Sequence, residues 1–177
     1  LMSWAKSAPS LIAVAAGREP ADLVIQNCCW VNVHTREILP NSNFAIKNGR
    51  FAYCGPEISH CIGNNTKIVN GEGRFAVPGF CDAHMHIESG MLTPGQFAHA
   101  VMAHGTTSMF TDPHEIANVL GLEGVRLMHD EAIIQPINIF TQMPSCAPSA
   151  PGLETTGFEI SPTDVEEAMK WPGIIGL

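Results

Sequence analysis

The sequence predicts an α/β protein in two parts, and two observations carry that prediction. Over residues 1–76, apolar runs alternate with polar residues and meet across an Asn-Gly pair, which is typical of antiparallel strands. Over residues 77–177, apolar strands alternate three times with helical patterns, which is typical of βα units around a parallel sheet. We therefore expect an amino-terminal helix with a small antiparallel β-sandwich segment, followed by a parallel α/β segment.

Composition is that of a globular protein and excludes some partners. The 177 residues are 45% hydrophobic and carry a formal net charge of -8, with only nine Lys and Arg residues. Phosphate binding needs clustered basic residues, so we expect no nucleic-acid partner. No apolar stretch approaches the length of a membrane span. The six cysteines include no Cys-x-x-Cys pair, which favours reduced thiols in a cytoplasmic protein.

In the first part, the apolar run Leu11–Ala16 is expected to form the buried side of a short helix. The hairpin is predicted at Asn48-Gly49, because both central residues of such a turn take positive φ. The strands expected in this part cover residues 22–27, 30–34, 43–47 and 50–54. His34 and His60 lie outside any motif, and we expect them to be solvated or structural.

In the second part, a strand over residues 77–88 comes first. A helix is predicted to begin with Thr93 as its N-cap and Pro94 at its first position, and to end at Gly105. The remaining elements expected in chain order are a strand at 106–111, a helix from about Asn118 with Val119, Leu122, Val125 and Met128 as its buried stripe, a strand at 136–143, a helix capped by Ser161–Asp164, and a strand from Gly173.

The stretch Val77–Glu88 carries the chemistry. On a strand the side chains alternate between faces, so Asp82, His84 and His86 should share one face. The two imidazoles would then lie about 7 Å apart along the strand, near enough to close on one metal ion if the strand twists. A bare His-x-His pair is otherwise an ordinary polar or core feature, so the surrounding residues decide its meaning.

Those surroundings resemble a known family. Pro-Gly-Phe-x-Asp-x-His-x-His, from Pro78 to His86, resembles the first barrel strand of the amidohydrolase superfamily. Longer runs look like the adenine deaminase family within it: His-Met-His-Ile-Glu-Ser at 84–89, Asp-Pro-His-Glu-Ile-Ala-Asn-Val at 112–119 and Met-Pro-Ser-Cys at 143–146. The resemblance covers about residue 20 to the end, and it implies that residues 77–177 form the first half of a TIM-type (β/α)8 barrel.

The resemblance also implies an activity. It implies a binuclear centre of manganese, iron or zinc with His84 and His86 as ligands, adenine as the small-molecule substrate, and a homo-oligomer. A divalent ion lowers the pKa of bound water to about 7, so a metal-activated hydroxide would attack C6 of adenine and release hypoxanthine and ammonia. The remaining ligands and the proton shuttle would come from later strands of the barrel.

Further site residues are expected at the carboxyl ends of the strands, where barrel enzymes place their chemistry. Substrate contacts or support for the ligands are expected from Asp82, Glu88, Ser89, Asp112, His114, Glu115, Ser145 and Cys146. The alternative is that Asp112 and Glu115 cap the following helix and that His114 lies on the surface. We expect His99, His104 and His129, which lie on or beside helices, to face solvent.

The length of the chain adds one expectation. A complete barrel of eight strands needs about 250 residues, and only about a hundred follow Pro78. We therefore expect an amino-terminal fragment of a longer enzyme that is inactive by itself.

Rival functions stay open. Another amidohydrolase, such as a cyclic amidohydrolase or a deacetylase, would share the His-x-His strand, although the run at 112–115 speaks against it. A deaminase of the cytidine type would also need Pro-Cys-x-x-Cys, which the chain lacks. A non-catalytic metal-binding module is favoured only if the natural protein ends at Leu177.

Overall fold

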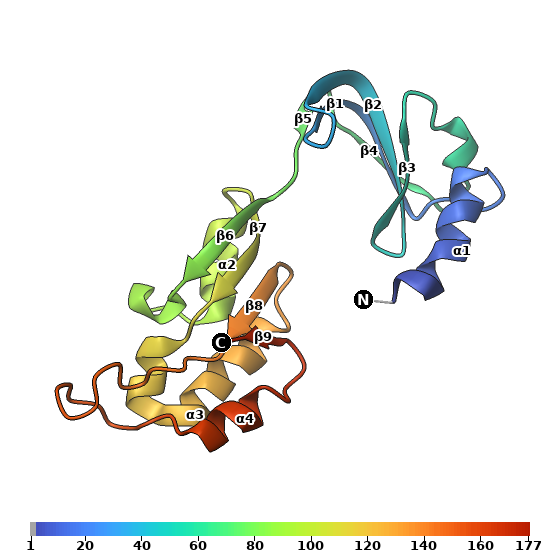
Figure 1. Cartoon of the computed structure of the whole chain (residues 1–177). Coiled ribbons are helices and arrows are strands. Elements are labelled where there is room, and N and C mark those ends of the chain that lie inside the picture. The colour runs from blue at the N-terminus through green and yellow to red at the C-terminus, as the bar shows by residue number, and fades with distance from the viewer. Residues whose placement is uncertain (1–2) are drawn as a thin grey trace. The chain divides into compact units, whose positions relative to one another are not determined.

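The computed structural model describes residues 3–177 and divides into two compact units (Figure 1). The first unit ends at Pro78 and the second begins at Gly79, whereas the sequence placed this boundary at residue 76. Within the described residues, no helix combines the length and the apolar character needed to cross a membrane. Each unit has its own core and is described by itself.

The first unit is a helix packed on one mixed sheet. Its elements are α1 (Trp4–Ala15), β1 (Leu23–Asn32), β2 (Glu37–Lys47), β3 (Arg50–Gly55), a 3-10 turn (Ser59–Cys61), β4 (Lys67–Asn70) and β5 (Phe75–Ala76). The strand order is β3-β2-β1-β4, and β5 also pairs with β1. Leu11 and Val14 of α1 are buried, so the helix expected around Leu11–Ala16 is present and begins earlier, at Trp4.

The sequence predicts a small antiparallel sheet or sandwich, and the structure has the antiparallel strands but only one sheet in the described part of this unit, so the sandwich is wrong. The pairs β1–β2 and β2–β3 are antiparallel, but β4 and β5 pair with β1 in parallel. The chain after Thr66 therefore extends the first sheet instead of building a second one opposite it. The core lies between this sheet and α1, where Val14, Val24, Ala45 and Ile58 are buried.

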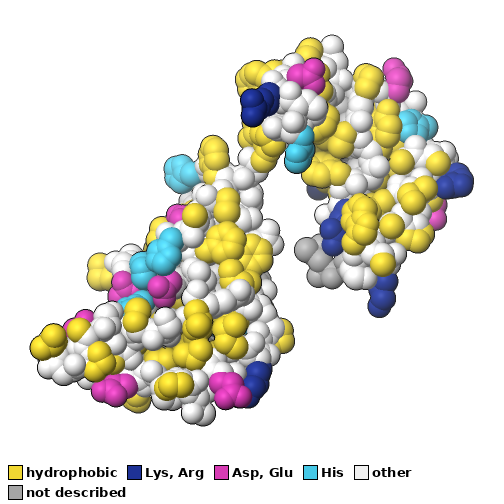
Figure 2. Space-filling view, viewed as in Figure 1, with side chains coloured by type: hydrophobic (Ala, Val, Ile, Leu, Met, Phe, Trp, Pro, Cys, Tyr) yellow, Lys and Arg dark blue, Asp and Glu magenta, His cyan; other side chains and the backbone are white. Residues whose placement is uncertain are grey.

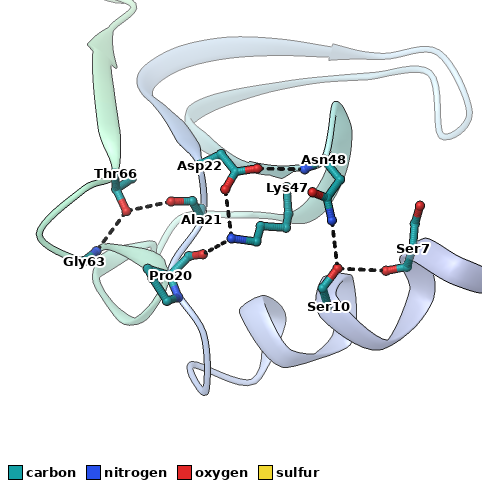
Figure 3. Close-up of polar contacts among 9 residues, drawn as sticks. All are labelled: Ser7, Ser10, Pro20, Ala21, Asp22, Lys47, Asn48, Gly63 and Thr66. Atoms are coloured by element: carbon teal, nitrogen blue, oxygen red, sulfur yellow. Dashed lines mark hydrogen bonds and ion pairs between the residues drawn. The ribbon is translucent and has the colours of Figure 1, made fainter. Parts of the chain in front are cut away.

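The hairpin at Asn48-Gly49 is confirmed, and Asp22 holds it in place (Figure 3). Both turn residues have positive φ, 52° and 70°. The Asn48 backbone N–H donates to Asp22 Oδ2 at 2.8 Å, and Lys47 Nζ lies 2.8 Å from Asp22 Oδ1. The Lys47 ammonium, followed by the Asn48 amide, lowers the pKa of Asp22 below its ordinary value of 3.8.

The second unit contains a parallel sheet whose strands follow one another in chain order. Its elements are β6 (Phe80–Met85), a 3-10 turn (Ile87–Gly90), α2 (Pro94–Met102), β7 (Thr106–Thr111), α3 (His114–Ala132), β8 (Asn138–Gln142), α4 (Pro162–Ala168) and β9 (Ile174–Gly176). The order is β6-β7-β8-β9, and all three pairs are parallel. The expected α/β class and the βα alternation are confirmed.

The two faces of this sheet differ in what covers them. Met109 of β7 and Ile139 of β8 are buried in a core with Ala98 of α2 and Met128 of α3, so this face packs on the helices. The opposite face carries Phe110 and Phe140, whose ring centroids lie 5.2 Å apart. Alternation along the strands therefore assigns each side chain of β7 and β8 to one of the two faces.

Helix α3 departs from the prediction. It begins at His114 instead of about Asn118, with Pro113 as its N-cap. Proline is accepted at the start of a helix because it has no backbone N–H that would need a partner there. Val119 is exposed although a buried position was expected. Gly121, at φ 61° and ψ -145°, interrupts the helix, which changes the helical phase between Val119 and the buried Val125.

His129 was expected to face solvent, and that expectation is wrong. The ring is buried, with Nδ1 3.1 Å from Thr141 Oγ1 of β8 and Nε2 3.1 Å from the Pro172 carbonyl oxygen. Burial lowers the pKa of His129 below 6.5, which favours the neutral ring. It joins the end of α3 to β8 and to the segment that enters β9.

We predict that Asp22→Asn destabilises the first unit by about 1 kcal/mol near neutral pH, a small effect because Asp22 is half-exposed and solvent screens the pair. A carboxyl whose folded-state pKa is lowered contributes stability above its unfolded pKa and loses it as the pH falls. The difference between wild type and variant should therefore shrink below pH 3.8.

The measurement is urea unfolding of the 177-residue chain, followed by tryptophan fluorescence in a Trp171→Phe background, which leaves Trp4 and Trp30 of the first unit as reporters. Glu72→Gln is the matched control, because the Glu72–Arg74 ion pair is largely exposed. A loss of stability as large in this control, or a difference independent of pH, would contradict the prediction.

Candidate metal centre

The site begins at the carboxyl end of β6, where the strand is irregular. The register to β7 shifts between Asp82 and Met85. Asp82 Oδ1 accepts a hydrogen bond of 3.1 Å from the His84 backbone N–H. The short buried strand expected over 77–88 is wrong in extent and burial: β6 covers only Phe80–Met85 and is mostly exposed, with β7 beside it in the sheet of the described residues.

His84 and His86 converge. Their Nε2 atoms lie 3.0 Å apart, and their ring centroids 4.8 Å apart. His86 lies between the end of the strand and the 3-10 turn at Ile87–Gly90. The chain bends there, so the two rings lie closer together than they would on a regular strand. If both nitrogens bound one ion at about 2.05 Å, they would subtend about 95°, between the octahedral and tetrahedral angles.

A third donor comes from the neighbouring strand. The Asp112 backbone N–H donates to the Met85 carbonyl at 2.9 Å, which places Asp112 beside the histidines. Asp112 Oδ2 lies 3.9 Å from His84 Nε2, and the donor atoms of His84, His86 and Asp112 all lie within 4.8 Å of one another. Two imidazole nitrogens and a carboxylate oxygen suit zinc, iron or manganese.

Acidic side chains surround the second nitrogen of His86. Glu115 Oε2 lies 3.0 Å from His86 Nδ1, at ion-pair distance but outside hydrogen-bond alignment. Ser89 Oγ donates to Glu115 Oε1 at 2.8 Å. Burial acts to raise the pKa of Glu115, but the Ser89 hydrogen bond and His86 outweigh it and lower that pKa. The lowered pKa favours the charged form of Glu115, whose carboxylate lies close to His86 Nδ1.

Glu88 lies beside Glu115 in a different state. Its Oε1 accepts from the Ile116 backbone N–H at 3.3 Å, and its Oε2 is buried without a hydrogen-bond partner among the described residues. Burial raises the pKa of Glu88, and the nearby Glu115 charge adds to that effect.

Of the other expected residues, His114 lies near His86, and Ser145 and Cys146 lie farther out. The His114 ring lies 6.4 Å from that of His86, between centroids, and Cys146 Sγ lies 3.7 Å from His114 Nδ1. Ser145 and Cys146 are both exposed, and the contact to His114 comes from Cys146. The N-cap of α3 is Pro113, with no side-chain cap hydrogen bond, so neither Asp112 nor Glu115 caps this helix.

One residue beside the site was not predicted. Gln142 is the last residue of β8, and its Oε1 is buried without a partner among the described residues. The signal was a polar residue at the carboxyl end of an apolar strand, where barrel enzymes place site residues. Figure 2 shows histidine and acidic side chains side by side on this unit.

Comparison with known proteins gives a consistent picture. The sequence profile of the Amidohydrolase family matches residues 75–171, more than half of the chain. A protein of Ruegeria pomeroyi named adenine deaminase is 71% identical over 175 residues, which cover 99% of this chain and 29% of that protein. One of Moorella thermoacetica with the same name is 52% identical, covering 94% and 28% respectively. The chain thus spans about three tenths of these relatives' length.

Among solved structures, molinate hydrolase superposes with a TM-score of 0.51 at 17% identity, over 70% of this chain and 30% of that one. At this identity the likeness concerns the fold alone.

The hydrogen bond from His84 to Asp82 yields a prediction. Asp82→Ala removes the acceptor and should weaken metal binding about tenfold, within the range observed when a ligand loses its supporting partner. Asp82→Asn keeps an oxygen acceptor at the same position and should bind metal nearly as wild type does. Equilibrium dialysis of the whole natural protein against zinc or manganese measures this, and an equal loss in both variants would contradict the proposed role of the hydrogen bond.

Proposed function

Because this chain belongs to the amidohydrolase family, we propose that it forms part of an enzyme that hydrolyses adenine to hypoxanthine and ammonia. The observation that carries the proposal is the convergence of His84, His86 and Asp112 at the carboxyl end of a parallel sheet. The names of the relatives, which share 52% to 71% of their aligned residues with this chain, support adenine as the substrate.

We propose that His84 and His86 hold one ion of a binuclear centre of manganese, iron or zinc, with Asp112 beside them as a third donor. When bound, such ions supply Lewis-acid activation of water for attack on C6 of the purine. The remaining ligands and the group that protonates the purine are assigned to parts of the whole protein outside these residues, because the relatives are more than three times as long.

The residues around the histidine pair have distinct proposed roles. Asp82 fixes the backbone of His84, and Glu115, held by Ser89, orients His86. Glu88 adds an acceptor buried next to Glu115. His114 and Ser145 lie toward the loops at the carboxyl ends of the strands, and we propose that they contact the substrate. Such loops carry substrate contacts in barrel enzymes.

Two proposals concern the setting of the enzyme. All six cysteines are free, which suits a reducing compartment and supports a place in the cytoplasm. A homo-oligomer is proposed from the resemblance to the adenine deaminase family, with no nucleic-acid or membrane partner.

We predict that His86→Ala in the whole natural protein removes bound metal and lowers kcat/KM for adenine by more than about a hundredfold. Loss of a hydrogen bond that supports a metal ligand costs up to about a hundredfold, and loss of the ligand itself should cost more. His99→Ala is the matched control, because His99 is an exposed histidine on α2 of the same unit. Metal content by atomic spectroscopy and ammonia release measure the two effects.

Retention of metal and activity in the His86→Ala variant would refute the metal site. If the wild-type protein released no ammonia from adenine but hydrolysed a cyclic amide or an acetylated amine, the substrate assignment would fail while the metal site stood.

A further inference from the structure

The face of the sheet that carries the histidine pair also carries a ladder of paired side chains on β7 and β8. Ser108 pairs with Asn138 and Phe110 with Phe140 in the parallel register. Asn138 Nδ2 donates to Ser108 Oγ at 3.3 Å, and the two phenylalanine rings are in contact. Two pairs of side chains on this face, Ser108 with Asn138 and Phe110 with Phe140, are therefore already in contact before the strands end.

The next step of the ladder places Asp112 beside Gln142. Thr111 and Thr141 pair in register and are buried, and Thr141 bonds to His129 of α3, so these two threonines face the helices. The residues that follow them lie on the opposite face. Adjacent strands lie about 4.8 Å apart, so Asp112 and Gln142 occupy neighbouring positions on that face.

These neighbours present unpaired acceptors. Gln142 Oε1 and Asp112 Oδ1 are both buried, and neither has a hydrogen-bond partner among the described residues. Asp112 Oδ2 is turned toward His84, which leaves Oδ1 for another partner. A buried acceptor without a donor is costly, and two of them on neighbouring residues suit a group with more than one N–H.

We propose that Gln142 is a specificity residue whose Oε1 accepts a hydrogen bond from the exocyclic amino group of a 6-aminopurine, with Asp112 Oδ1 as the neighbouring acceptor. This inference rests on the proposed function for the identity of the ligand. The amino group has two N–H donors, one for each oxygen. An amide also recognises the amino group of adenine in nucleic-acid complexes.

The same pair would discriminate against the product. Hypoxanthine has an oxygen at C6 in place of the amino nitrogen, and two acceptors facing an acceptor repel each other. A site built to pair with an N–H group rejects an analogue that lacks it, because its own buried groups then stay unpaired. Gln142 thus favours the amino purine over both the oxo purine and unsubstituted purine.

The test compares binding of 6-aminopurine and purine, which differ only in the amino group. The whole natural protein is dialysed against a chelator, so that no turnover consumes the ligand, and both dissociation constants are measured by calorimetry. In the wild type, 6-aminopurine should bind more tightly. Gln142→Met, which keeps the side-chain length without an acceptor, should weaken 6-aminopurine about tenfold, the cost of one hydrogen bond, and leave purine unchanged.

Asn138→Leu is the matched control, because Asn138 lies on the same face of the same strand, four residues before Gln142 and away from the site. It should leave both constants unchanged. Equal weakening of the two ligands in Gln142→Met, or no preference for 6-aminopurine in the wild type, would overturn the inference.

The metal-loaded wild-type protein is assayed separately for ammonia release from adenine. Absence of turnover together with a preference that depends on Gln142 would reject the proposed deamination and uphold amino-group recognition. Turnover without that preference would reject only the role of Gln142.

Discussion

The hydrogen bond between the Asp112 amide and the Met85 carbonyl is the contact on which the site depends. It continues the parallel pairing of β6 and β7 beyond the irregular register at Asp82. Without it, the carboxylate of Asp112 would not lie beside imidazoles that come from 26 and 28 residues earlier in the chain. The site is thus a property of paired strand ends and not of the His-x-His motif alone.

The electrostatics of the site favour a cation. Asp112 and Glu115 flank the histidine pair, Glu88 lies next to Glu115, and the described site residues include no lysine or arginine. Like charges that lie close together raise one another's free energy unless a positive group is shared between them. The raised pKa of Glu88 reflects this situation, since burial and the neighbouring carboxylate both favour its neutral form.

Local signals predicted most of the second unit. The strand at 106–111 matches β7, and Ser161 and Asp164 cap α4 as expected. In the first unit, a local signal also predicted the hairpin at Asn48-Gly49. What failed depended on tertiary packing. Nothing local distinguishes a buried His129 from an exposed one, because its partners, Thr141 and Pro172, are 12 and 43 residues away. The parallel return of β4 beside β1 is equally nonlocal, so the antiparallel pattern suggested a sandwich.

The candidate site shows the same division. Motif spacing indicated His84 and His86, and strand ends indicated Asp112 and Glu115. The 3.0 Å approach of the two imidazoles needs the end of the strand at Met85, which alternation alone did not predict. Gln142 was missed because its significance lies in the unpaired state of its oxygen, a property that only coordinates reveal.

The burial of His129 has a consequence for mild acid. Burial lowers the pKa of the folded ring, whereas in an unfolded chain the ring takes up a proton near pH 6.5. Protonation therefore favours the open state, and this contribution to stability declines as the pH falls below that value. Since the ring joins β8 and the segment before β9 to α3, mild acid should weaken the attachment of β8 and β9 before that of β6 and β7.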